Sequence, residues 1–156
     1  MDFNKLTIKS GEAVARAQEL ARQAGNPELT RDHLAAALLE QELPRTLLQR
    51  AGAEPGAILA ETEARIRALP AVSGSNAQPQ AGASFRKALD GAFEETRKLD
   101  DDFVSVEHLV LALYQSRQSD QCLRVLYCRV DQTLDSSVAR QTRNHFLLEA
   151  AGNKVC

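Results

Sequence analysis

Several kinds of signal are missing from this chain, and each absence excludes a class of protein. The formal charge is −2, from 19 Lys and Arg against 21 Asp and Glu, so the electrostatic footprint of a nucleic-acid-binding protein is absent. No apolar run approaches the length that crosses a bilayer, and the first residues, MDFNKLTIKSGE, lack the apolar core of a signal peptide. We therefore expect neither a nucleic acid nor a membrane as a partner.

Cysteine is scarce and confined to the last third of the chain, at Cys122, Cys128 and Cys156. An odd number placed this way disfavours a disulfide framework and favours the reducing cytoplasm. Cys122 and Cys128 would lie on different faces of a helix, and no spacing typical of zinc ligands accompanies them. The acidic run 100–102 lacks the alternating oxygen ligands of a calcium loop, so we expect no metal site.

A phosphate-binding loop of the form G-x-x-x-x-G-K-[ST] is also missing. Gly52 and Gly56 lie close together, but no Lys followed by Ser or Thr comes after them. No nucleophile paired with a general base can be recognised either. We therefore expect that this chain alone is not an enzyme and binds neither ATP nor another cofactor.

What the chain does contain is an internal duplication. The segment 29–41, LTRDHLAAALLEQ, returns 75 positions later at 104–116 as VSVEHLVLALYQS. In both copies a hydroxyl residue, Thr30 or Ser105, can cap a helix, and an acid, Asp32 or Glu107, lies in its first turn. Apolar residues follow at helical spacing. The fold should therefore be built from two copies of one helical unit.

Helical spacing and capping signals predict four helices in each copy. In the first copy, one helix runs from Thr7 to about Ala24, a second begins after Thr30, a third covers 44–50 and a fourth begins near Pro55. In the second copy, one helix begins after Ser84, a second after Ser105, a third lies around 122–126 and a fourth begins after Asp131. The stretch 70–82, PAVSGSNAQPQAG, carries no charge and indicates an extended connector. The match between the copies weakens after about Gln118.

These elements predict one all-α domain over residues 1–150, followed by a tail at 151–156. Repeat one would cover about 6–69, a linker about 70–83, and repeat two about 84–150. The composition, with 44% hydrophobic and 26% charged residues, is that of an ordinary globular domain. We expect the two four-helix repeats to be related by a pseudo-twofold axis and to bury each other's apolar faces.

His33 and His108 are tempting candidates for catalysis or metal binding, because each follows a carboxylate. They occupy equivalent positions in the two repeats, however, and no third partner is evident. A duplicated structural role explains this better: each ring packs at a helix start and its nitrogens satisfy nearby backbone.

The motifs of both repeats resemble the N-terminal domain of the Clp AAA+ unfoldases. In repeat one the resemblance is carried by Leu6-Thr7, 13–21, Gly25-Asn26, Leu29-Thr30, His33-Leu34 and 37–39; in repeat two it is carried by 104–113. The connector residues 69–74 and 78–80 are closer to the ClpB disaggregases than to ClpC or ClpA. The resemblance is specific over 6–115 and partial beyond.

This resemblance implies a mobile appendage of a hexamer that weakly binds unfolded or aggregated polypeptide and passes it to an ATP-driven pore. ATP and Mg²⁺ would act in the full-length protein, and the isolated domain would be a monomer. By the family's motif, the substrate-binding residues fall on Thr7, Asp101 and Glu107, in a mainly hydrophobic groove with polar edges. Neighbouring apolar residues such as Leu6, Leu89 and Phe103 are more often core than contact.

One alternative stays open. The chain could be a stand-alone Clp-repeat adaptor or stabilising subunit that docks onto a Clp machine without handing substrate to a motor of its own. A Walker motif in frame downstream of Cys156 would favour the disaggregase.

Overall fold

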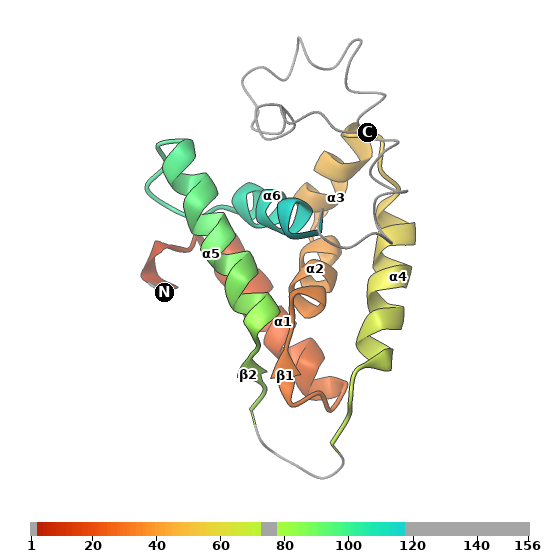
Figure 1. Ribbon diagram of the computed structural model, residues 1–156. Helices are drawn as coiled ribbons and strands as arrows, with labels where there is room; N and C mark the ends of the chain where they lie inside the picture. Colours follow the sequence, from red (N-terminus) through yellow and green to blue (C-terminus); the bar gives the residue numbers. More distant parts are fainter. Residues whose placement is uncertain (1–2, 73–77, 118–156) are drawn as a thin grey trace.

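Six α-helices and two very short strands make up the part of the chain that the computed structural model describes, residues 3–72 and 78–117. In chain order they are η1 (Phe3–Lys5), α1 (Ile8–Gln23), β1 (Glu28–Leu29), α2 (Arg31–Glu40), α3 (Glu42–Arg50), α4 (Pro55–Ala68), β2 (Gln80–Ala81), α5 (Ala83–Lys98) and α6 (Val106–Arg117). Helix α2 lies at the centre and packs against α1 and α4, while α5 packs against α6 (Figure 1). The all-α prediction is confirmed.

Local chemistry sets the ends of these helices. The Thr7 hydroxyl oxygen accepts a hydrogen bond from the Ser10 backbone N–H at 3.3 Å, which caps α1. Gly25 then takes a left-handed conformation, with φ of +69°, and the chain turns away from the helix. Pro55 occupies the first turn of α4, where its missing N–H costs nothing.

Two symmetrical backbone pairings confirm the predicted pseudo-twofold. Leu6 forms a parallel bridge with Val104, and Leu29 pairs in parallel with Ala81 in the β1–β2 ladder. A shift of 75 residues exchanges these pairs, since it takes Leu6 to Ala81 and Leu29 to Val104. In each pair, the segment before the first helix of one repeat joins the segment before the second helix of the other.

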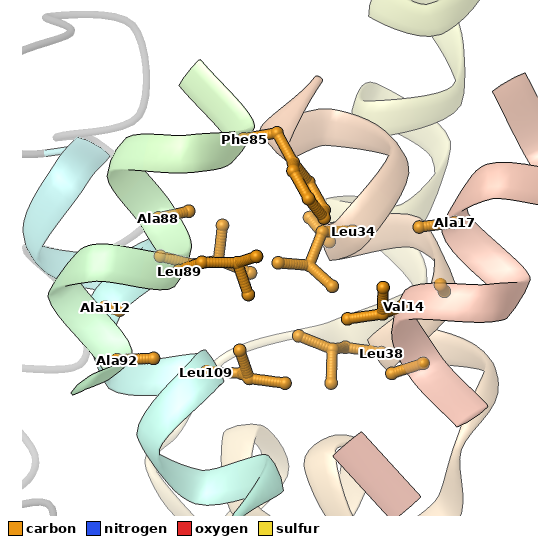
Figure 2. Packing of buried hydrophobic residues seen from close by; sticks show 14 of the residues in the cluster. Val14, Ala17, Leu34, Leu38, Phe85, Ala88, Leu89, Ala92, Leu109 and Ala112 are labelled. Atoms are coloured by element: carbon orange, nitrogen blue, oxygen red, sulfur yellow. The ribbon is translucent and has the colours of Figure 1, made fainter. Parts of the chain in front are cut away.

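The core lies where α1 and α2 of repeat one meet α5 and α6 of repeat two (Figure 2). Leu34 and Leu38 of α2 point toward Leu89 of α5 and Leu109 of α6, and alanines on the surrounding helices allow close approach. Each of these leucines is at most 2% exposed. Burying one leucine side chain contributes about 1.5–3 kcal/mol, so this interface between the repeats stabilises both.

Two sequence-based details were wrong. Helix α5 begins at Ala83 with Gly82 as its N-cap, so Ser84 is not the cap. Its hydroxyl oxygen instead accepts the Arg31 backbone N–H at 3.3 Å, at the start of α2. Helix α3 begins at Glu42 rather than 44. The extended connector contains the two-residue strand β2, which the sequence did not predict.

Other predictions lie outside the described residues. These are the helices around 122–126 and after Asp131, the environments of all three cysteines, and the tail at 151–156. The domain boundaries at 69, 83 and 150 therefore stay predictions.

Candidate functional site

The start of α1 and the loop before α6 lie side by side. The Thr7 backbone N–H donates to the Val104 carbonyl at 3.0 Å, and the Val104 N–H donates to the Lys5 carbonyl at 2.7 Å. Asp101 and Glu107 each lie three residues from Val104 along the chain. The fold thus brings the segments that hold all three family-implied residues, Thr7, Asp101 and Glu107, to one end of the domain.

Two large apolar side chains are exposed at this junction. Ile8, the first residue of α1, is 82% exposed, and Phe103, next to Val104, is 55% exposed. The expectation that Phe103 belongs to the core was therefore wrong, while Leu89 is buried and Leu6 is partly buried. We define the junction surface as Thr7, Ile8, Asp101, Phe103 and Glu107. Exposed apolar side chains bordered by carboxylates are typical of an interaction surface.

Thr7 and Glu107 also have the structural roles that the sequence predicts. Thr7 caps α1 through its hydroxyl, which lies 2.9 Å from the Ser10 hydroxyl as well. Glu107 is half-buried in the first turn of α6, where a negative charge is favoured by the helix dipole. Neither role prevents contact with a bound molecule.

Asp101 lies against a buried histidine. Asp100 ends α5 in a left-handed conformation, with φ of +57°, and the Asp101 N–H donates to the Thr96 carbonyl at 3.0 Å. The Asp101 Oδ2 atom then lies 3.2 Å from His108 Nε2. The His108 side chain is 2% exposed and that of Asp101 is 42% exposed, so the carboxylate lies between the core and solvent.

The hydrogen bonds of His108 fix its tautomer. Its Nδ1 accepts the Ser105 backbone N–H at 3.0 Å, so in the neutral ring the proton must be on Nε2, the atom that lies 3.2 Å from Asp101 Oδ2. The predicted structural role of both histidines is confirmed, because His33 makes the equivalent bond, from the Thr30 N–H to its Nδ1, at 3.1 Å.

In repeat one, the equivalent histidine His33 has a different partner at Nε2. Nε2 of His33 donates to the Asn26 amide oxygen at 3.1 Å, and the Asn26 amide nitrogen donates to the Pro70 carbonyl at 3.0 Å. Asn26 is 4% exposed and ties the connector to repeat one. Burial lowers the pKa of the His33 imidazole, and the nearby Asp32 carboxylate opposes that shift.

The symmetry-related end of the domain lacks equivalents of Ile8 and Phe103. A shift of 75 residues places Ala83 and Glu28 where the junction surface has Ile8 and Phe103. There Asn26 replaces Asp101 and is covered by the connector, and Asp32 replaces Glu107 and lies 3.6 Å from Arg65. The two ends share a backbone plan but differ in their exposed apolar side chains. One exposes Ile8 and Phe103, and the other exposes Val72, which is 48% exposed and whose backbone N–H donates to the Gly25 carbonyl at 2.9 Å.

The described part of the chain also contains a hollow. It is a small apolar pocket of about 30 Å³ between α2, α3, α4 and α6, lined by Ala35, Leu38, Leu39, Pro44, Leu48, Ile58, Val110 and Leu113. No lining residue is ionisable or nucleophilic, so the pocket offers no catalytic group. Over residues 3–72 and 78–117, no cluster of three or more His, Cys, Asp or Glu side chains could hold a metal ion.

Within the described part of the chain, no helix is both long enough and apolar enough to cross a bilayer.

Comparison with solved structures shows the same fold in N-terminal domains of other Clp proteins. The Hsp104 N-terminal domain of Candida albicans superposes with a TM-score of 0.70 at 19% identity, covering 85% of this chain and 93% of that one. The N-domain of ClpV from Vibrio cholerae gives a TM-score of 0.67 at 20% identity, covering 88% and 84%. At these identities the likeness concerns the fold.

Comparison with curated proteins shows closer relatives. The chaperone protein ClpB of Nitratidesulfovibrio vulgaris is 40% identical over 129 residues, covering 76% of this chain and 14% of the relative. ClpB of Mycobacterium tuberculosis is 36% identical over 115 residues, covering 72% and 14%. The chain thus spans about one seventh of these relatives' length.

A family model described as the Clp repeat (R) N-terminal domain matches residues 5–126, which is most of the chain. The match covers this repeat domain and no ATPase module. The chain therefore belongs to the Clp repeat N-terminal domain family.

Proposed function

We propose that this chain is the substrate-engaging domain of a ClpB-like disaggregase. It binds unfolded or aggregated polypeptide weakly at the junction surface and delivers it to a hexameric motor in the cytoplasm, where ATP and Mg²⁺ act. The observation that carries the proposal is the asymmetry of the two ends: Ile8 and Phe103 are exposed at one, and their counterparts at the other are Ala83 and Glu28.

The size of the junction surface supports weak binding. Two apolar side chains such as Ile8 and Phe103 contribute roughly 3–6 kcal/mol when a partner covers them fully. Such free energies correspond to dissociation constants from about tens of micromolar to several millimolar. A domain that passes its substrate onward needs this fast release, because tight binding would hold the polypeptide on the domain.

The chemistry of the surface supports a polypeptide as the ligand. Apolar side chains bordered by Asp101 and Glu107 can cover exposed apolar residues of a partner while accepting its unpaired N–H groups. One structural neighbour, the ClpV N-domain, was solved in complex with a VipB peptide. Peptide binding by a domain with this fold supports the same class of ligand here.

A titration tests the proposal directly. A fluorescently labelled, permanently unfolded protein is titrated with the wild-type domain and with the variants Ile8→Ser, Phe103→Ser, Thr7→Ala and Glu107→Ala. We expect Ile8→Ser and Phe103→Ser each to weaken binding about tenfold, because each removes one buried apolar contact of about 1.5 kcal/mol or more.

The matched control is Val72→Ser, since Val72 is a 48% exposed apolar side chain whose backbone N–H donates to the Gly25 carbonyl at 2.9 Å, at the opposite end of the domain. This control should bind like the wild type, and circular dichroism should show every variant folded. Equal binding by the wild type, Ile8→Ser and Phe103→Ser would remove the junction surface as the site. Unchanged binding by both Thr7→Ala and Glu107→Ala would remove those two residues from it.

A further inference from the structure

The two histidines have different partners at Nε2, and their shared structural role does not require this difference. His33 is satisfied by a neutral amide, Asn26, whereas His108 faces a carboxylate, Asp101. Both rings carry the same backbone bond at Nδ1, so both present an Nε2 proton that either kind of oxygen can accept. The negative charge of Asp101 is thus not needed to hold His108.

The charge also has an electrostatic cost. Asp101 lies in the chain between Asp100 and Asp102, and Glu107 follows at the start of α6. Like charges close together repel one another, so an amide at position 101 would satisfy His108 with less repulsion. The carboxylate stands instead where Phe103 and Ile8 are exposed, and its side chain is 42% exposed. The charge is therefore accessible to a molecule outside the domain.

We propose that His108 is a positioning residue for substrate binding. The Nε2 atom of its buried ring lies 3.2 Å from Oδ2 of Asp101, and this contact fixes the orientation of the carboxylate. The other oxygen, Oδ1, accepts a backbone N–H of a polypeptide that lies over Ile8 and Phe103. This inference rests on the function proposed above and adds to it how the domain recognises the polypeptide main chain.

Recognition through the main chain suits this surface. Every residue except proline carries a backbone N–H, and unfolded segments present these groups unpaired. A hydrogen bond from an N–H to a carboxylate is about twice as strong as one between neutral groups. An oriented carboxylate next to apolar side chains thus selects unfolded segments without selecting a sequence.

The internal repeat provides a matched pair of variants. His108→Asn and His33→Asn each keep an oxygen that can accept the N–H at the helix start and each lose the Nε2 donor. Both should cost similar stability. In the same titration, we expect His108→Asn to weaken binding about fivefold to tenfold and His33→Asn to change it less than about twofold, because only His108 orients a group at the junction surface.

A double variant distinguishes positioning of Asp101 by His108 from direct contact of His108 with the polypeptide. Asp101→Asn copies the partner that His33 has in repeat one, so it should preserve the melting temperature and weaken binding about threefold to tenfold. If His108 acts through Asp101, the variant carrying both Asp101→Asn and His108→Asn should bind no more weakly than Asp101→Asn alone. Additive losses would overturn the inference.

The possible failures can be told apart. If Ile8→Ser weakens binding but His108→Asn and His33→Asn change it equally, the positioning role is wrong and the proposed site remains. If the wild type does not bind the unfolded protein, both are wrong. If His108→Asn does not fold, Asp101→Asn decides the case, and wild-type affinity in that variant would overturn the inference. Ring ¹⁵N shifts give a further check, because a proton on Nδ1 of His108 would contradict it.

Discussion

Each repeat pairs a buried histidine with a different partner, Asn26 for His33 and Asp101 for His108. Asn26 with His33 is buried and ties the connector to repeat one through the Pro70 carbonyl. Asp101 with His108 has the same backbone geometry but opens to solvent at the junction surface. The change from amide to carboxylate removes a donor and adds a charge. Single substitutions at these positions should therefore have opposite consequences for stability and for binding.

The first prediction concerns Asn26. Asn26→Asp removes the donor to the Pro70 carbonyl and places a carboxylate where the native side chain is 4% exposed. We expect the free energy of unfolding, measured with urea, to fall by about 1–3 kcal/mol, the typical cost of leaving a buried polar group unsatisfied. The reciprocal control is Asp101→Asn, which should change it by less than about 0.5 kcal/mol. Equal losses of unfolding free energy in Asn26→Asp and Asp101→Asn would contradict the structural role assigned to Asn26.

The second prediction concerns pH and His33. Burial lowers the pKa of this imidazole below its usual value in the unfolded chain, so between the two values the unfolded chain binds more protons. Stability should therefore be lost as the pH falls below about 6.5, by at most about 1.4 kcal/mol per pH unit from this group. Urea titrations of the wild type and His33→Asn over this range measure it. A variant with the same pH dependence as the wild type would contradict this cause.

At the scale of elements, the two repeats end their first helix differently. Gly25 takes φ of +69° after α1, and the equivalent residue after α5, Asp100, takes φ of +57°. Only glycine adopts this region at little cost, so repeat two carries local backbone strain that repeat one avoids. The strain lies immediately before Asp101.

The third prediction follows from these helix ends. Asp100→Gly should raise the free energy of unfolding by up to about 1 kcal/mol, and Gly25→Ala should lower it by about 1–2 kcal/mol. A Cβ atom at Gly25 would lie 3.6 Å from the Val72 carbonyl oxygen, so conformation and not collision sets the cost. Chemical denaturation of both variants measures this. A loss of stability in Asp100→Gly would indicate that the Asp100 side chain has a role of its own.

Element boundaries show where sequence-based prediction succeeded and failed. The caps Thr7 and Thr30 were predicted from residue type and confirmed. The prediction that Ser84 caps α5 was wrong, and it was made because serine is in general a better cap than glycine. The repeat pointed to the observed cap, because the residue 75 positions after Thr7 is Gly82. Strand β2 was missed because Gln80 and Ala81 have no strand pattern. Their partner is a segment of repeat one, which only the tertiary fold brings near.

At the scale of the whole molecule, the duplication predicts most of what the structure contains. It predicts the two helical repeats, their pseudo-twofold and the equivalent histidines. The pairing of His108 with Asp101 could have been predicted from the 75-residue shift between the repeats, since Asn26 and Asp101 are 75 positions apart. The roles of Thr7, Asp101 and Glu107 came from family resemblance, because a cap and a first-turn acid are common in any helix. The exposure of Phe103 required the structure.

The pseudo-twofold also provides the internal control for the central claim, that polypeptide binds at one end of the domain and not at its symmetrical counterpart. The most direct test is a backbone NMR titration of the ¹⁵N-labelled domain with an unfolded polypeptide. We predict that shift changes gather at Thr7, Ile8 and 101–107 and that the equivalent residues, Gly82, Ala83 and 26–32, stay unchanged. Equal changes at both ends, or changes confined to the pocket between α2, α3 and α4, would contradict the account.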